Sequence, residues 1–168
     1  MSTQRGFCQN TDVGGSARRL LAKRLRDLRA RYRYTQQAVS ERSGLDYKYY
    51  QRIEGKRPPN LTVDSLERLA RVFGVGLSEL LQRPDLPAAS YARDAGAAPN
   101  IQHRLARRLR TLRRQGGWTP AELAQRTGLS LRQIQRLEDP RHPATARVDT
   151  LERLAAAFTL STSQLLDC

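Results

Sequence analysis

The chain has 168 residues, a formal net charge of +14, and 39% hydrophobic residues. A charge of this sign favours a polyanionic partner, and nucleic acid is the commonest such partner of a basic protein. No apolar run approaches the roughly 20 residues of a membrane helix, and the first residues lack the apolar region of a secretion signal. We therefore expect a cytoplasmic protein without a membrane partner.

An internal repeat divides the chain. Residues 63–70, VDSLERLA, return as residues 148–155, VDTLERLA, and the residues before both stretches also match. The shift between the copies is 84 residues up to Glu138 and 85 from Val148 onward, so the second copy carries one extra residue in a loop. A unit of this length has the size of a small domain rather than of a solenoid repeat. The repeat therefore predicts two domains.

Composition gives the domain boundaries. Residues 1–16 have no apolar period, and residues 84–100 contain three prolines and six alanines, so we predict a disordered tail and a flexible linker. The predicted domains then cover residues 17–83 and 101–168. They carry net charges of +9 and +6, so each domain is basic by itself.

In chain order, the first predicted element is an amphipathic helix with a basic outer face. Leucines recur at helical spacing among arginines and lysines, and the second copy repeats the pattern. The leucines of the first copy are Leu20, Leu21, Leu25 and Leu28, and the apolar residues of the second are Ile101, Leu105, Leu109 and Leu112.

Turn and capping residues place the next two helices. Thr119-Pro120-Ala121-Glu122 is a capping box with proline in the first turn, and Gly128 can end that helix in a left-handed conformation. The first copy has the equivalent helix between Thr35 and Gly44. Asp46 and Ser130 can act as N-caps of the helices that follow. Two helices joined by a short glycine turn form the helix-turn-helix pattern.

Two more helices complete each repeat. We predict a fourth helix around residues 63–73 and 148–158 and a short fifth around 77–82 and 162–167. The leucines and phenylalanines of these segments should form the core. They are Leu66, Leu69, Phe73 and Leu80 in the first copy, and Leu151, Leu154, Phe158 and Leu165 in the second. The predicted fold is all-α, with two tandem five-helix domains joined by the linker.

This series of motifs resembles the lambda-repressor-like (Xre/Cro-type) helix-turn-helix family, and the resemblance covers both repeats. The matching motifs are Thr35-Gln36-Gln37-Ala38-Val39-Ser40, Gly44-Leu45, Arg52-Ile53-Glu54-Gly55-Lys56-Arg57-Pro58 and Leu66-Glu67-Arg68-Leu69-Ala70. The resemblance implies sequence-specific binding to duplex DNA. Both copies depart from the family at its glycine two places after the glutamate, where they have Lys56 and Pro140.

In a helix-turn-helix domain, the second helix of the pair lies in the major groove and its first residues reach base edges. The resemblance then implies that residues at the start of this helix read the sequence in the first copy, and that the helix before it and the loop after it contact phosphates. Lys48 and Arg52 can donate to guanine O6 and N7. The predicted base-reading residues are Tyr47, Lys48 and Arg52, with Tyr49 and Gln51 at the groove edge. The predicted phosphate contacts are Gln36, Lys56 and Arg57.

The second copy has different reading residues. Leu131 offers only an apolar contact, for example to a thymine methyl group, whereas Arg132 and Arg136 keep two guanidinium groups. Gln133 lies between them, and Arg141 lies in the loop that follows; we predict DNA contacts for all five residues. Pro120 replaces Gln36, which removes one phosphate contact. This copy is therefore expected to have weaker or different specificity, or to serve dimerisation.

The resemblance also implies an internal ion pair in each copy, between Arg29 and Glu54 and between Arg113 and Glu138. A carboxylate that faced phosphates without a partner would be repulsive. We therefore interpret both pairs as structural.

No catalytic, metal or cofactor site is evident in the sequence. Cys8, Cys168, His103 and His142 are too scattered for a metal site, and no nucleophile is paired with a base. We expect no enzyme activity, no cofactor and no small-molecule substrate. The predicted function is a transcriptional regulator, a repressor, that binds double-stranded DNA at two half-sites, close to the nucleoid, with homodimerisation left open. The alternative is an antitoxin-like or adaptor protein whose main partner is another protein.

Overall fold

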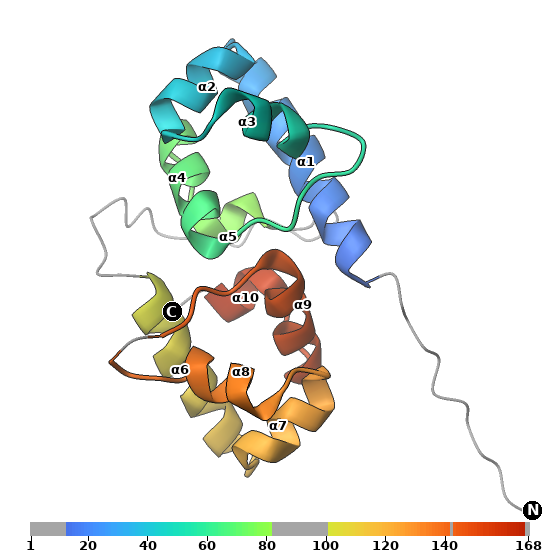
Figure 1. Cartoon of the computed structure of the whole chain (residues 1–168), viewed down its shortest axis with the longest axis vertical. Coiled ribbons are helices and arrows are strands. Elements are labelled where there is room, and N and C mark those ends of the chain that lie inside the picture. Colours follow the sequence, from blue (N-terminus) through green and yellow to red (C-terminus); the bar gives the residue numbers. More distant parts are fainter. Residues whose placement is uncertain (1–12, 82–100, 142, 167–168) are drawn as a thin grey trace, which may run out of the picture.

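The computed structural model describes residues 13–81, 101–141 and 143–166, and these residues form ten helices (Figure 1). None of the described helices is long and apolar enough to cross a membrane. The all-α prediction is confirmed, and the same series of five helices occurs twice. In the first domain these are α1 (Val13–Arg31), α2 (Gln36–Ser43), α3 (Tyr47–Ile53), α4 (Val63–Phe73) and α5 (Leu77–Leu80). In the second they are α6 (Ile101–Gln115), α7 (Pro120–Thr127), α8 (Leu131–Leu137), α9 (Val148–Ala157) and α10 (Thr162–Leu166).

Helix α1 begins at Val13, four residues before the predicted domain boundary at residue 17. The predicted tail therefore contributes its last residues to the first helix. The predicted linker, residues 84–100, lies outside the described residues, as do residues 1–12.

The predicted capping residues are where the helices begin and end. Thr35 accepts a hydrogen bond from the Ala38 backbone N–H at 3.1 Å, and Gly44 ends α2 with a φ of 64°. In the second domain Thr119 and Glu122 form the predicted capping box, and Gly128 ends α7 with a φ of 65°. Side chains thus satisfy backbone donors that have no partner within the helix.

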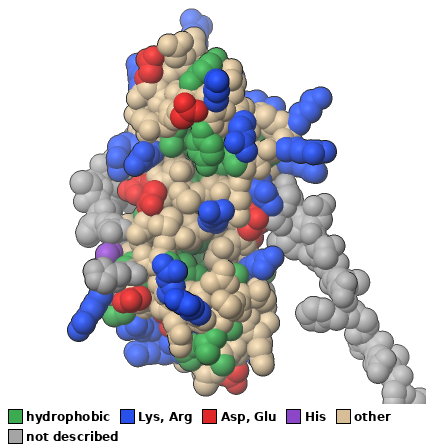
Figure 2. Space-filling model, viewed as in Figure 1, with side chains coloured by type: hydrophobic (Ala, Val, Ile, Leu, Met, Phe, Trp, Pro, Cys, Tyr) green, Lys and Arg blue, Asp and Glu red, His purple; other side chains and the backbone are tan. Residues whose placement is uncertain are grey.

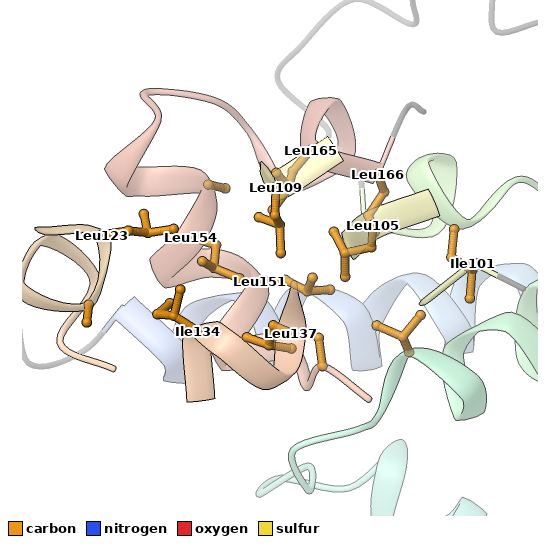
Figure 3. Packing of buried hydrophobic residues seen from close by; sticks show 14 residues of the cluster. Ile101, Leu105, Leu109, Leu123, Ile134, Leu137, Leu151, Leu154, Leu165 and Leu166 are labelled. Atoms are coloured by element: carbon orange, nitrogen blue, oxygen red, sulfur yellow. The ribbon is translucent and has the colours of Figure 1, made fainter. Parts of the chain in front are cut away.

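Each domain has its own apolar core. The predicted leucines of α4 and α9 are fully buried, and so is Phe73, whereas Phe158 is only partly buried. Figure 3 shows leucines and isoleucines from α6, α7, α8, α9 and α10 converging on one centre. Five short helices therefore bury a common core in each half of the molecule.

The two domains pack against each other about an approximate twofold axis. In Figure 1 a half-turn about the line of sight carries α1–α5 onto α6–α10. The fifth helices, α5 and α10, contact one another across this axis, and α1 contacts α9. The sequence predicted a flexible linker between the domains, and no motif in it indicated this interface.

An antiparallel β-bridge lies at the centre of the interface. Thr62, just before α4, pairs with Arg147, just before α9. The Val63 N–H donates to the Ala146 carbonyl at 2.9 Å, and the Val148 N–H donates to the Leu61 carbonyl at 3.0 Å. The two hydrogen bonds are equivalent to each other, because a shift of 85 residues relates Val63 to Val148 and Leu61 to Ala146. The bridge is therefore symmetric.

Polar side chains flank the bridge. The Arg18 guanidinium contacts the Asp149 carboxylate at 2.9 Å, and at the equivalent place Gln102 donates to the Asp64 carboxylate. Thr145 also donates to Asp64, at 3.3 Å. The same surface of each domain thus forms both sides of the contact, as in a twofold dimer.

Candidate nucleic-acid interface

The second and third helices of each domain form a bihelical unit. In the first domain the turn between α2 and α3 is closed by the Leu45 N–H, which donates to the Ser40 carbonyl at 3.2 Å, and by the Ser40 hydroxyl, which donates to the Leu45 carbonyl at 2.7 Å. Asp46 then caps α3 by accepting from the Tyr49 N–H at 2.9 Å. These contacts fix the angle at which α3 leaves the turn.

In the second domain α7 and α8 are also joined by a short glycine turn, but Ala124 replaces Ser40, and the Leu129 N–H donates to the Thr127 hydroxyl at 3.4 Å. Ser130 is the N-cap of α8. Gln133 completes a capping box, because its side-chain carbonyl accepts from the Ser130 N–H at 2.9 Å. We predicted Ser130 as a cap but not this second half of the box, although the Ser-x-x-Gln spacing is its sequence signal.

Helices α3 and α8 each turn one side to the core and the other to solvent. Tyr50 and Ile53 are buried in the first domain, and Ile134 and Leu137 are buried in the second. The exposed side begins with an equivalent pair of residues, Tyr47 and Leu131, whose exposed fractions are 42% and 43%. The first residue of this helix, Tyr47 in one domain and Leu131 in the other, is therefore accessible to a binding partner.

A buried carboxylate anchors the end of α3. The Glu54 carboxylate accepts from Arg29 Nε at 2.8 Å and from Arg29 Nη2 at 3.0 Å, which confirms the predicted ion pair. It also accepts from the Gln36 amide at 2.8 Å and from the Tyr50 hydroxyl at 2.7 Å. Burial raises the pKa of Glu54, but the hydrogen bonds from Arg29, Gln36 and Tyr50 outweigh it and lower that pKa below its usual value of 4.5.

The neighbours of Glu54 respond to the same contacts. Burial, together with the hydrogen bond to Glu54, raises the pKa of Tyr50. The hydrogen bond to Glu54 raises the pKa of Arg29 as well. Arg29 and Tyr50 are thus held in the protonated forms that donate to Glu54. The contacts at Glu54 join α1, α2 and α3 at one point.

The second domain keeps the ion pair with fewer donors. Arg113 contacts the Glu138 carboxylate at 2.7 Å through Nε and at 2.8 Å through Nη2, as predicted. Pro120 and Ile134 stand where the first domain has Gln36 and Tyr50, and neither has a side-chain donor. The end of α8 is instead held by a hydrogen bond from Arg110 to the Glu138 backbone carbonyl at 2.8 Å.

The predicted DNA-binding residues of the first domain lie on one surface. A hollow is lined by the predicted residues Lys48, Gln51, Arg52, Lys56 and Arg57, all of them exposed, together with Gly55. This hollow brings four cationic side chains together from the helix and the loop after it, an arrangement that can receive a phosphate group.

The two remaining polar candidates of the first domain are less free. Tyr49 is half-buried and packs against the core. Gln36 is half-buried, and its amide already donates to Glu54. Either residue can therefore offer DNA only part of its side chain.

The predicted residues of the second domain are also exposed. Leu131, Arg132, Gln133 and Arg136 lie on the outer side of α8, and Arg141 lies in the following loop. The Gln133 carbonyl is engaged by Ser130, so only its NH₂ group could face a partner. We did not single out Gln135, which is exposed and equivalent to Gln51; alignment of the two copies would have found it.

Helices α3 and α8, which would be the recognition helices of the predicted helix-turn-helix units, lie on the same face of the molecule. In the view of Figure 1, α3 lies in front of α1, and α8 lies in front of α6. Figure 2 shows this face with Lys and Arg side chains spread over both domains, and a group of them stands at the level of the loop after α3. Helices α3 and α8 therefore share a face that carries Lys and Arg side chains on both domains.

An aromatic and cationic contact that we did not predict supports each bihelical unit. The Arg42 guanidinium lies 4.4 Å from the ring centre of Tyr34, and Arg126 lies 4.2 Å from that of Trp118. The two pairs occupy equivalent positions of the two copies. No group of three His, Cys, Asp or Glu side chains that could hold a metal ion occurs among the described residues.

Two basic bihelical units, each with a capped, exposed second helix, define the class of a helix-turn-helix protein. The profile of the helix-turn-helix domain family matches residues 20–82 and again residues 104–166. The chain therefore belongs to this Xre/Cro-like family, in two tandem copies, as the sequence predicted. Searches of curated protein sequences and of solved structures gave no significant match. The family indicates a DNA-binding regulator.

Proposed function

We propose that this protein is a transcriptional repressor that binds one duplex DNA site with both domains, each domain reading one half-site. The observation that carries this proposal is the placement of α3 and α8 on one face, related by the approximate twofold axis. Dimeric helix-turn-helix proteins bind in this way, with two recognition helices in successive major grooves on one side of the duplex. Here both helices belong to one chain.

The reading residues are those predicted from the sequence. In the first domain Lys48 and Arg52 donate to base edges, while Tyr47 contacts the bases beside them and Gln51, Lys56 and Arg57 contact phosphates. In the second, Arg132 and Arg136 donate to base edges and Leu131 contacts a thymine methyl group. Because the two sets differ, the two half-sites differ in sequence.

Repression needs no further chemistry from the chain. A protein bound in two successive major grooves of a promoter excludes polymerase from that DNA. Its charge of +14 gives it a general affinity for DNA, which would keep it at the nucleoid between specific sites.

Selection of binding sites from random duplex DNA at about 150 mM salt tests the proposal, because specific contacts survive at this salt while purely electrostatic binding fades. We compare the intact protein with Lys48→Ala/Arg52→Ala and with Arg132→Ala/Arg136→Ala. A matched control is Arg68→Ala/Arg71→Ala, which removes two exposed charges from α4. The intact protein and the control should enrich a bipartite site, and each reading variant should lose one half.

Loss of about 1 to 3 kcal/mol is expected for each good bidentate base contact that is removed. Enrichment of no sequence, with binding that only weakens as salt rises, would refute specific reading. It would favour the alternative in which the main partner is another protein.

A further inference from the structure

The interface between the two domains contributes to both cores. Val63, from the first domain, is fully buried in the core cluster of the second domain, and Val148 is fully buried in the cluster of the first. Leu77 of α5 and Leu81, the residue that follows α5, pack against both clusters. Separating the domains would expose these aliphatic side chains to water, which is unfavourable.

The same interface satisfies backbone donors at the helix starts. Val63 and Val148 are the first residues of α4 and α9, so their N–H groups have no acceptor within the helix. Each donates instead to the other domain, at 2.9 and 3.0 Å. The next N–H of α9, that of Asp149, donates to the Asn60 side chain at 3.3 Å.

This last contact replaces a missing cap. Thr62 caps α4 by accepting from the Ser65 N–H, but Arg147, the equivalent residue before α9, makes no such hydrogen bond. The start of α9 therefore depends on Asn60 and Leu61 of the first domain. Docking of the domains is thus part of how the second domain is built.

We propose that this interface acts as a ruler: it fixes the two recognition helices so that the protein, as a single chain, accepts its two half-sites only as an inverted repeat with one spacing. The inference rests on the proposed function. A flexible tether would accept inverted and direct repeats and a range of spacings. A docked twofold pair presents its helices in opposite directions along the duplex, at one separation. The positioning residues are Arg18, Val63, Asp64, Gln102, Val148 and Asp149.

The bridge offers a direct test. Thr62 and Arg147 face each other as a pair whose own N–H and carbonyl groups do not bond across the bridge, and such pairs have Cα atoms about 4.5 Å apart. That separation lies within the range of about 4.4 to 6.8 Å for a disulfide. The variant Thr62→Cys/Arg147→Cys, in a background with Cys8→Ser and Cys168→Ser, can therefore be locked by oxidation. The reduced protein is its matched control, since the sequence is identical.

We measure binding of the full-length chain to duplexes that carry the two selected half-sites as inverted or direct repeats at a series of spacings. The oxidised protein should bind the best inverted repeat within about threefold of the reduced protein. Both forms should lose about 100-fold when the spacing changes by half a helical turn or one half-site is reversed, since two-site avidity is then lost.

A second variant weakens the interface between the domains and needs no crosslink. Arg18→Glu places a carboxylate against Asp149, while the control Arg71→Glu makes the same charge change within α4, next to Glu67. Arg18→Glu should flatten the spacing profile, with a smaller penalty for a half-turn change, whereas Arg71→Glu should keep the sharp profile.

The outcomes separate the two proposals. The proposed fixed spacing is wrong if the oxidised protein loses the bipartite site that the reduced protein binds. It is also wrong if the intact protein tolerates direct repeats and altered spacing. In both cases the proposal that the two domains read two half-sites is still supported. If no bipartite site is selected at all, the proposed function fails and the ruler fails with it.

Discussion

The two halves of this molecule share one scaffold and differ at the points where the scaffold is held together. In the first domain Glu54 accepts hydrogen bonds from Arg29, Gln36 and Tyr50. In the second, Glu138 keeps the arginine, but proline and isoleucine replace the other two donors. The second domain has other contacts: Arg110 donates a hydrogen bond to the Glu138 backbone carbonyl at the end of α8. The start of α9 is capped by Asn60 of the first domain. A repeated fold can thus keep its geometry while its polar contacts are redistributed.

The largest effect should come from removing the two carboxylates. Glu54→Ala leaves an arginine, a tyrosine and a glutamine without their acceptor, and we expect the free energy of unfolding to fall by about 3 to 5 kcal/mol. Glu138→Ala leaves only Arg113 without its acceptor, so the free energy of unfolding should fall by less, about 1.5 to 3 kcal/mol. Urea denaturation of the full chain measures both. Equal losses would show that the extra donors in the first domain contribute nothing.

Acid should weaken the first domain through the same group. The pKa of Glu54 is lowered on folding, so the unfolded chain takes up a proton at a higher pH than the folded protein does. This contribution to stability is complete above the ordinary pKa of 4.5 and is lost as the pH falls toward and through the lowered folded value. Thermal unfolding between pH 6 and pH 3 should therefore show a smaller decline for Glu54→Gln than for the intact protein. Parallel curves would contradict this assignment.

A smaller effect, on DNA sequence preference, is expected from substitutions of the first residues of α3 and α8. Tyr47 and Leu131 occupy equivalent, equally exposed positions, so truncation to alanine tests them on equal terms. Leu131→Ala should reduce the preference for thymine at one position of its half-site by about 1 kcal/mol. Tyr47→Ala should alter only the other half-site. Competition binding with single-base variants of the selected site measures both, and an effect of either change on the wrong half-site would overturn the assignment of helices to halves.

The smallest effect concerns the cap that only one copy has. Arg147→Thr would give α9 the capping residue that Thr62 provides for α4, and should stabilise the protein by about 0.5 to 1 kcal/mol. Arg147→Ala is the control, because it removes the arginine without supplying a cap. If alanine stabilises as much as threonine does, loss of the arginine rather than capping explains the gain.

The sequence by itself determined the elements and the family. Local signals were sufficient for the caps Thr35, Asp46, Thr119 and Ser130, because a helix start depends on residues within one turn. The leucine spacing predicted most of the core residues, although Leu20 is exposed, and the repeat predicted two helix-turn-helix domains. The ion pairs at Glu54 and Glu138 followed from the resemblance to the family, and the structure confirms both.

Only the tertiary structure decided how the two copies meet. Nothing local marks Val63 or Val148 as residues that enter the core of the other domain, because a buried valine has the same sequence pattern whichever core it fills. The extra donors to Glu54 from Gln36 and Tyr50 were also hidden, since they depend on where three helices cross. Contacts within a helical turn can be read along the chain, whereas contacts between domains depend on complementary surfaces that form only after each domain has folded.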